Sequence, residues 1–344
     1  MPIKKKTARK RVSKRLSTHS KKRPGPLRRL ALRLLGFAVL ATCLFIFARD
    51  ELGIDSPEQD RAIANNTELQ VALAREGFSP GSIDGDPGAQ TKQALGAFQV
   101  AHQLLPSGVF DSETARALRI VDPVYARVEL TVADFARVAT KPSNWVDRGK
   151  LDAMHFNSVL EMVAEHAQSD PDYIRALNPT LNWEALNPGD QILVPHVLPF
   201  QISGELGYVR IQLAQRILQA FDHDNRLRFH CPVSIARNVG KRPTGQLAVK
   251  VLVDQPNYTF NPNILSQTAQ REGITQKFII QPGPNNPVGS VWIGLNLPSY
   301  GIHGTPEPEK VGRTESSGCF RLANWNAKTL LKASWVGMSV QIDP

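Results

Sequence analysis

Cys319 and His303 are the side chains of this chain whose types and spacing are best suited to chemistry. His303 follows a short apolar stretch that predicts a strand, and a polar loop separates it from Ser316-Ser317-Gly318-Cys319. A cysteine nucleophile needs a base that removes its proton and backbone N–H groups that hold the developing oxyanion. A free thiol titrates near pH 8.5, so an adjacent histidine is a direct way to reach thiolate at neutral pH. The pattern predicts acyl chemistry on Cys319, although for a bare Cys and a bare His a buried thiol and an unrelated surface imidazole are the commoner explanation.

The residues around this pair resemble the catalytic domain of the L,D-transpeptidases. The segment 300–322 reads YGIHGTPEPEKVGRTESSGCFRL and holds the runs I-H-G-T and S-S-G-C-F-R-L. Upstream, R-P-T-G at 242–245 and GPNNPVGSVWIGL at 283–295 match the family as well. Members of this family cross-link peptidoglycan through an acyl-enzyme on cysteine. The resemblance covers residues 200–344 and implies a mainly-β, sandwich-like catalytic domain.

This resemblance assigns roles to the residues of the motif. It makes Cys319 the nucleophile and His303 the base, with the carbonyl of Gly304 orienting the imidazole. The amides of Ser317, Gly318 and Cys319 are expected near the oxyanion. Many members carry a second histidine at the position of Ser317, so the role of that histidine is in doubt here.

Further residues of this region have expected roles that are less specific. Ser316, Arg321 and Tyr300 are expected to order the loop or the substrate, and a buried structural arginine is the alternative for Arg321. Cys231 lies in a β-like run and is expected to be a core thiol, because a disulfide with Cys319 would block the chemistry. No metal or cofactor is expected, because five further histidines show no metal-ligand spacing: His155, His166, His196, His223 and His230.

The elements that must position the motif read as strands. Val209, Ile211 and Leu213 alternate with polar residues, and Leu247 to Val253 alternate in the same way. Two stretches, 262–273 and 324–336, predict helices, with Asn324 as the N-cap of the second and Gly337 as its end.

Residues 67–118 resemble the small three-helix peptidoglycan-binding module of cell-wall enzymes. Two helix-like stretches flank Gly/Asp turns, and Asp84-Gly85 and Phe110-Asp111 are expected at matching places of a short internal duplication. Thr91 and Thr114 are expected to start helices. The family pattern is carried by Asp84, Gly85, Thr91, Ala94, Leu95, Phe98 and Gln99.

Two segments flank this module. Residues 49–66 are polar and predict a linker. Residues 119–198 hold a helix, a second helix that ends in L-N-P, and the strand QILVP, an order similar to a LysM glycan-binding repeat. The usual first strand and turn are replaced by the longer stretch 128–157, so a family-specific connector is an equal alternative.

The N-terminus carries the positive charge of the chain. Residues 1–33 hold fourteen Lys or Arg and no acidic residue. The rest of the chain, residues 34–344, holds the other 27 of the 41 basic residues and 31 acidic ones, a net charge of −4. This distribution argues against a nucleic-acid-binding domain. The fifteen residues 34–48 carry no charge, and counting back to Leu30 gives nineteen, which predicts an uncleaved signal anchor at 30–48 with cleavage as the alternative. The positive-inside rule keeps the tail in the cytoplasm and exports the rest to the periplasm.

These observations predict an inner-membrane-anchored L,D-transpeptidase whose partners are peptidoglycan stem peptides and glycan. One alternative is an L,D-carboxypeptidase or other hydrolase that releases the same acyl-enzyme to water. Another is a wall-binding tether without activity, against which the retention of both His303 and Cys319 argues.

Overall fold

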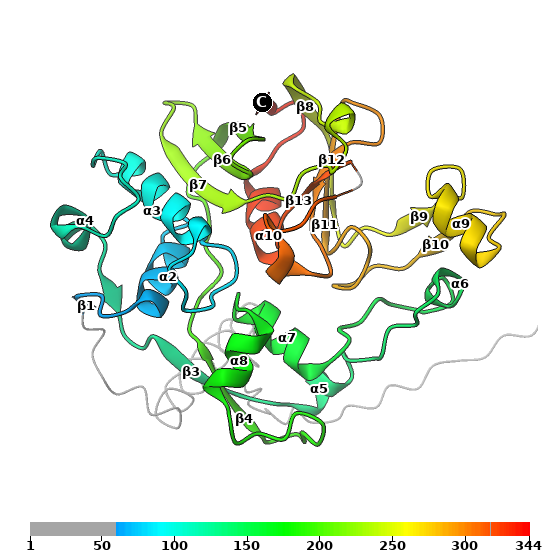
Figure 1. Cartoon of the computed structure of the whole chain (residues 1–344), viewed down its shortest axis with the longest axis horizontal. Helices are drawn as coiled ribbons and strands as arrows, with labels where there is room; N and C mark the ends of the chain where they lie inside the picture. The colour runs from blue at the N-terminus through cyan, green and yellow to red at the C-terminus, as the bar shows by residue number, and fades with distance from the viewer. Residues whose placement is uncertain (1–59, 317) are drawn as a thin grey trace, which may run out of the picture. The chain divides into compact units, whose positions relative to one another are not determined.

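The computed structural model describes residues 60–316 and 318–344. They comprise a helical module, a small α/β segment and a sheet-based domain (Figure 1). None of the helices in these residues is long and apolar enough to cross a membrane. The predicted tail at 1–33 and anchor at 30–48 lie outside the described residues.

The module begins earlier than the sequence indicates. Its three helices are α2 (Asn66–Arg75), α3 (Ala89–Ala101) and α4 (Ser112–Ala117). Strand β1 (Asp60–Arg61) pairs with β2 (Ile120–Val121), so the two ends of the module are joined. The stretch predicted as a linker therefore includes β1 and the first residue of α2, with irregular structure at 62–65 between them.

An internal duplication is present, and two buried glutamines define it. Gln70 Nε2 donates to Thr91 Oγ1 at 3.2 Å, and its Oε1 accepts from the Gly85 amide at 2.8 Å. Gln99 Nε2 donates to Thr114 Oγ1 at 2.9 Å, and its Oε1 accepts from the Gly108 amide at 2.9 Å. Gly85 thus matches Gly108, which corrects the expected match with Phe110-Asp111.

The two threonines of this duplication also correct the expected helix starts. Gly88 is the N-cap of α3 and Asp111 that of α4, so Thr91 and Thr114 lie inside the first turns. Their hydroxyls accept hydrogen bonds from the buried glutamines, and the Thr114 hydroxyl also donates to the N-cap side chain of Asp111 at 2.8 Å.

The segment 119–198 contains a two-stranded sheet and two main helices. Strands β3 (Tyr125–Glu129) and β4 (Gln191–Pro195) pair antiparallel, and α7 (Val159–His166) and α8 (Pro171–Leu177) lie between them in the chain. A first strand is therefore present, and the departure from a LysM repeat is the insertion that follows it. That insertion carries α5 (Val132–Phe135) and α6 (Trp145–Arg148). LysM-like identity remains a prediction.

The C-terminal domain is built on one eight-stranded sheet, in the order β13-β12-β11-β8-β14-β5-β6-β7. Its strands are β5 (Leu206–Gln212), β6 (Ile217–Asp222), β7 (Leu227–Pro232), β8 (Gly245–Asp254), β11 (Val291–Leu295), β12 (Gly301–His303), β13 (Phe320–Arg321) and β14 (Ser339–Asp343). Most neighbours are antiparallel, but β14 pairs parallel with β5, and β12 with β13. The alternating runs in β5 and β8 are confirmed as strands.

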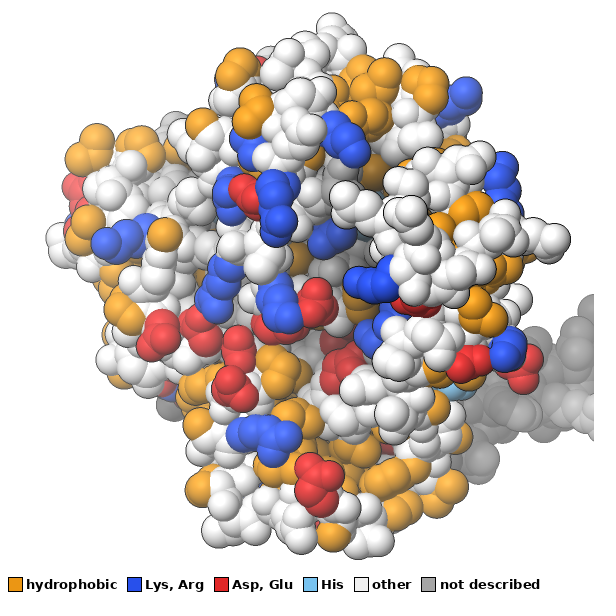
Figure 2. Space-filling view, turned by 45° about the vertical axis from the view of Figure 1, so that its right-hand side comes forward, with side chains coloured by type: hydrophobic (Ala, Val, Ile, Leu, Met, Phe, Trp, Pro, Cys, Tyr) orange, Lys and Arg blue, Asp and Glu red, His pale blue; other side chains and the backbone are white. Residues whose placement is uncertain are grey.

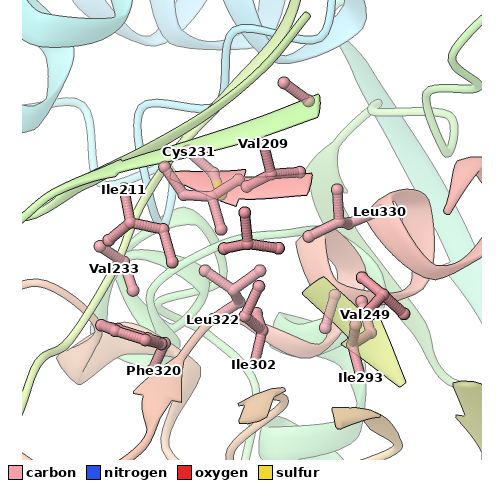
Figure 3. Packing of buried hydrophobic residues seen from close by; sticks show 14 of the residues in the cluster. Val209, Ile211, Cys231, Val233, Val249, Ile293, Ile302, Phe320, Leu322 and Leu330 are labelled. Atoms are coloured by element: carbon pink, nitrogen blue, oxygen red, sulfur yellow. The ribbon is translucent and has the colours of Figure 1, made fainter. Parts of the chain in front are cut away.

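Curvature of this sheet encloses the core. Val209 of β5 and Ile302 of β12 belong to one apolar cluster although β11, β8 and β14 separate their strands. On a flat sheet these strands would lie about 19 Å apart, at about 4.8 Å per strand. Figure 3 shows both residues facing a common interior, with Leu330 of α10 (Asn324–Ala333) beside it. The sandwich-like prediction is thus refined to a single sheet that closes on itself.

A projection, residues 256–281, leaves the sheet between β8 and β11; we call it the lid. It consists of β9 (Tyr258–Phe260), α9 (Ser266–Glu272) and β10 (Phe278–Ile280) around a small apolar cluster. Helix α9 ends at Gly273, whose φ of 67° suits glycine, as expected for the first predicted helix. Figure 2 shows basic and acidic side chains next to one another on one face of the molecule.

Candidate active site

Strand alternation places His303 and Cys319 on the same side of the sheet. In β12, Ile302 points into the core with 1% exposure, so its neighbour His303 faces the other way. In β13, Phe320 is 1% exposed and in register with Ile302, which turns Cys319 and Arg321 outward. Parallel pairing of two very short strands therefore brings the predicted base and nucleophile together.

Both side chains line one cavity of about 820 Å³. The floor comes from the sheet and the Cys319 loop, and one wall comes from the lid. Its described lining residues include Lys241 and Arg321 but no Asp or Glu. The cavity therefore favours an anionic ligand. The sheet and Cys319-loop residues of the lining include Trp292, Ser299, Tyr300, His303, Ser316, Gly318, Cys319 and Arg321.

The imidazole of His303 is held from two sides. Its Nδ1–H donates to Gly304 O at 2.6 Å; because a carbonyl can only accept, Nδ1 carries the proton and Nε2 keeps the lone pair in the neutral ring. The ring stacks on Trp292 at 5.7 Å between centroids and 25°. Trp292 can lie flat there because position 301 is a glycine: a Cβ on Gly301 would come within 2.7 Å of the indole.

Burial sets the protonation state of both groups. It lowers the pKa of His303 to about 4, against the hydrogen bonds from the ring to the carbonyls of Gly304 and Val288, which favour the protonated form. Burial also raises the pKa of the Cys319 thiol, although the Gly301 amide and the Arg321 charge act in the opposite direction. The resting pair is thus a neutral imidazole and a thiol, not the thiolate that the sequence led us to expect.

Cys319 is not yet aligned for attack. Its thiol donates to Ser299 O at 3.4 Å, and no hydrogen bond joins it to His303 among the described residues. Proton transfer to Nε2 therefore requires rotation of the Cys319 side chain. Ser299 itself has a φ of 66°, an uncommon conformation for a non-glycine residue.

The turn before Cys319 is closed by Ser316. Ser316 Oγ donates to Cys319 O at 2.6 Å and accepts from the Gly318 amide at 3.2 Å. Since the Gly318 N–H is already bonded, its role at an oxyanion remains a prediction that requires this bond to open. Ser317 lies outside the described residues. Tyr300 lines the cavity, and its hydroxyl donates to Lys241 O at 3.0 Å, which ties the Tyr300 loop to the predicted R-P-T-G turn.

Arg321 lines the cavity with a half-buried side chain. Its Nε is buried without a partner, and none of the ion pairs among the described residues includes it. A buried guanidinium group with free donors is suited to a carboxylate.

Asn324 is a positioning residue that the sequence assigned to a different task. It is the first residue of α10, whose N-cap is Ala323, and the helix ends at Ala333, before Gly337; both predicted ends are therefore wrong. Its side chain is fully buried, and Oδ1 accepts from the amides of Ser290 and Thr305, both at 3.1 Å. Thr305 follows β12 and Ser290 precedes β11, the strand paired with β12, so Asn324 fixes the backbone around the predicted base His303.

Glu315 is a second positioning residue without a signal in the sequence. Its carboxylate pairs with Arg216 at 3.2 Å, Arg237 at 3.3 Å and Arg242 at 3.8 Å. Three guanidinium groups from distant parts of the chain thus hold the residue that precedes Ser316. The sequence alone could not indicate this cluster, because only the fold brings the three arginines to Glu315.

Family models match two parts of the chain. Residues 64–118 match the model described as "Putative peptidoglycan binding domain", and residues 207–342 match the model described as "L,D-transpeptidase catalytic domain". Among curated relatives, "Putative L,D-transpeptidase YkuD" of Bacillus licheniformis is 24% identical over 190 residues, which cover 54% of this chain and 93% of the relative. "Putative L,D-transpeptidase YqjB" of Bacillus subtilis is 30% identical over 124 residues, 35% of this chain and 61% of the relative.

The comparison with solved structures also returned L,D-transpeptidases. One from Xylanimonas cellulosilytica matches with a TM-score of 0.33 and 16% identity, covering 83% of this chain and 96% of that chain. L,D-transpeptidase 3 from Mycobacterium tuberculosis matches with a TM-score of 0.33 and 12% identity, covering 46% of this chain and 77% of that chain. On the family matches, residues 207–342 belong to the L,D-transpeptidase catalytic domains and residues 64–118 to the peptidoglycan-binding domains.

Proposed function

We propose that this protein forms peptidoglycan cross-links as an L,D-transpeptidase, with Cys319 as nucleophile and His303 as base. The observation that carries the proposal is the parallel pairing of β12 with β13, which turns both side chains into one cavity of about 820 Å³. A pocket of this size accepts a peptide stem rather than a single amino acid.

The reaction begins on the amide that follows the L-centre of a donor tetrapeptide. Cys319 Sγ attacks the carbonyl carbon while its proton passes to Nε2 of His303, and the carbonyl oxygen becomes an oxyanion. When the tetrahedral intermediate collapses, the C–N bond breaks and the imidazolium returns the proton to the departing D-residue amine. The thioester then reacts with an amine of a neighbouring stem, and the same imidazole takes the amine proton and returns one to sulfur.

The low pKa of His303 favours the step in which the imidazolium returns its proton. An imidazolium in a buried site is a strong acid, so it gives its proton readily to the leaving amine. Because both groups are uncharged at rest, proton transfer accompanies the attack instead of preceding it. The Gly304 carbonyl supports the ring through both steps, since Nδ1–H stays bonded to it.

Intact-protein mass spectrometry with a disaccharide-tetrapeptide donor tests the proposal. The wild-type chain is expected to gain the mass of the donor minus its terminal D-residue, and Cys319→Ala is expected to gain nothing. With an acceptor amine present, the cross-linked product should replace the hydrolysed one. An adduct that persists on Cys319→Ala would refute the assignment, and hydrolysis unaffected by acceptor would indicate the carboxypeptidase alternative.

We also propose the cellular position that the sequence indicates. The fourteen basic residues before an uncharged stretch favour a single-pass anchor in the inner membrane, with the catalytic domain in the periplasm. The module at 64–118 would hold the enzyme on peptidoglycan. Protease digestion of spheroplasts tests the topology: residues beyond 49 should be cleaved while an N-terminal tag stays protected.

A further inference from the structure

A residue from outside the catalytic-domain match lines the active-site cavity. Trp145 belongs to α6, within the insertion of the segment 119–198, yet it contributes to the same lining as Cys319. We call residues 141–150 the α6 arm. Figure 1 shows α6 beside the lid elements β9, α9 and β10.

The tip of the arm is packed into the lid. The Trp145 ring lies 5.1 Å from Phe260 and 6.1 Å from Tyr258 between centroids, and its backbone N–H donates to Glu272 Oε2 at 2.8 Å. Arg148 covers the indole at 5.2 Å. The arm therefore completes the apolar cluster that gives the lid its shape.

The root of the arm is bonded to the chain that leads from the lid back to the sheet. Lys141 Nζ donates to Asn285 Oδ1 at 2.7 Å, and Asn285 Nδ2 donates to His155 O at 2.9 Å. Backbone bonds join Met154 N to Pro282 O at 2.8 Å and Asn285 N to Met154 O at 3.1 Å. With both tip and root attached, the position of the lid over the cavity depends on the arm.

We propose that Trp145 determines specificity for the donor by fixing the lid wall of the cavity. The donor is a muropeptide that carries an anionic stem peptide. This inference rests on the proposed function. The reacting amide is handled by Cys319, His303 and the turn at Ser316. The rest of a long donor must lie against the lid wall, where Trp145, Tyr258 and Asn261 are lining residues. A small acylating reagent needs much less of that wall.

The test compares two acylating substrates on the full chain. A disaccharide-tetrapeptide represents the long donor and a carbapenem the small one, both followed as Cys319 adducts by mass spectrometry. For Trp145→Ala, the ratio of muropeptide to carbapenem acylation efficiency should fall at least about tenfold, mainly through a higher KM. Trp145→Phe should recover most of the ratio, because it keeps an aromatic contact with Phe260.

Two further variants separate specificity from folding. Glu272→Ala removes the bond to the Trp145 amide and should lower the same ratio, while Glu272→Gln keeps an acceptor and should restore it. Val146→Ala, an exposed neighbour that does not line the cavity, should behave as wild type. An unchanged ratio in Trp145→Ala, whether both substrates fall together or neither falls, would overturn the inference. If the wild type itself forms no muropeptide adduct, the proposed function fails and the inference with it.

Discussion

Asn324 Nδ2 donates to Glu165 Oε2 at 2.8 Å in the buried space between α10 and α7. Glu165 belongs to the segment 119–198, and Asn324 holds the amides of Ser290, before β11, and Thr305, after β12. The α/β segment is thus connected to the base of the catalytic pair by a single polar side chain. This segment therefore contributes to the architecture around His303.

The buried carboxyl group makes stability depend on pH. Burial raises the pKa of Glu165 from its ordinary 4.5 to about 7, against the hydrogen bond from Asn324, which favours the charged form. Between these values the folded protein holds a proton that the unfolded chain has lost. Stability contributed by this group is therefore present below pH 4.5 and is lost as the pH rises to about 7, by up to about 3 kcal/mol.

Glu165→Gln should remove this dependence. Urea unfolding at pH 5 and pH 8 should show that the variant loses less stability than the wild type over this interval, and that it is the more stable protein at pH 8. The exposed Glu184→Gln serves as the control and should keep the wild-type profile. His303 and His230, whose pKa values burial lowers to about 4 and about 3, act in the opposite direction in every variant and cancel in the comparison. Parallel profiles of wild type and Glu165→Gln would contradict the assignment.

The resting thiol predicts slow alkylation at neutral pH. Because burial raises the pKa of Cys319, its reaction with iodoacetamide should keep increasing through pH 9, where an ordinary thiol with a pKa near 8.5 levels off. Cys319→Ala reports the background from Cys43 and Cys231. A plateau below pH 8 would mean that a thiolate–imidazolium pair exists before substrate binds.

The backbone around His303 tolerates no side chain at position 304. A Cβ on Gly304 would lie 2.1 Å from Asn324 Oδ1 and 3.1 Å from the Ser290 amide, in a fully buried site. Gly304→Ala should therefore cost at least about 2 kcal/mol in urea unfolding and disturb the His303 loop. Gly88→Ala meets no atom within 4 Å and should cost at most about 1 kcal/mol, as expected for an N-cap glycine. Equal free energies of unfolding for the two variants would show that Asn324 can move away from the new Cβ without loss of stability.

The sequence could single out Cys319 and His303 because a local signature carries them, and the structure brings both to one cavity; their roles as nucleophile and base stay predictions. The alternation in β5 and β8 was equally visible. Asn324 was misread as a helix cap, because its partners are 34 residues away at Ser290 and 159 residues away at Glu165. Trp145 could not be placed at the cavity for the same reason. Contacts of this kind arise from tertiary packing. They cannot be predicted from hydrophobic periodicity or from helix-capping patterns, which describe only local structure.

Arg321 can be tested as the group that binds a substrate carboxylate. Arg321 lines a cavity whose described lining has no acidic residue, and its buried Nε has no partner, so a carboxylate would supply the guanidinium group with an acceptor. Arg321→Gln should raise the KM for a donor with a free terminal carboxylate about tenfold, while a donor amidated at that carboxylate should show little difference between variant and wild type. Arg321→Lys keeps the charge but not the paired donors, so its KM for the free-carboxylate donor should lie between those of the wild type and Arg321→Gln. Only direct recognition makes the rise in KM depend on the carboxylate of the donor. If Arg321→Gln raises the KM for both donors equally, Arg321 is the buried structural arginine that the sequence also allowed.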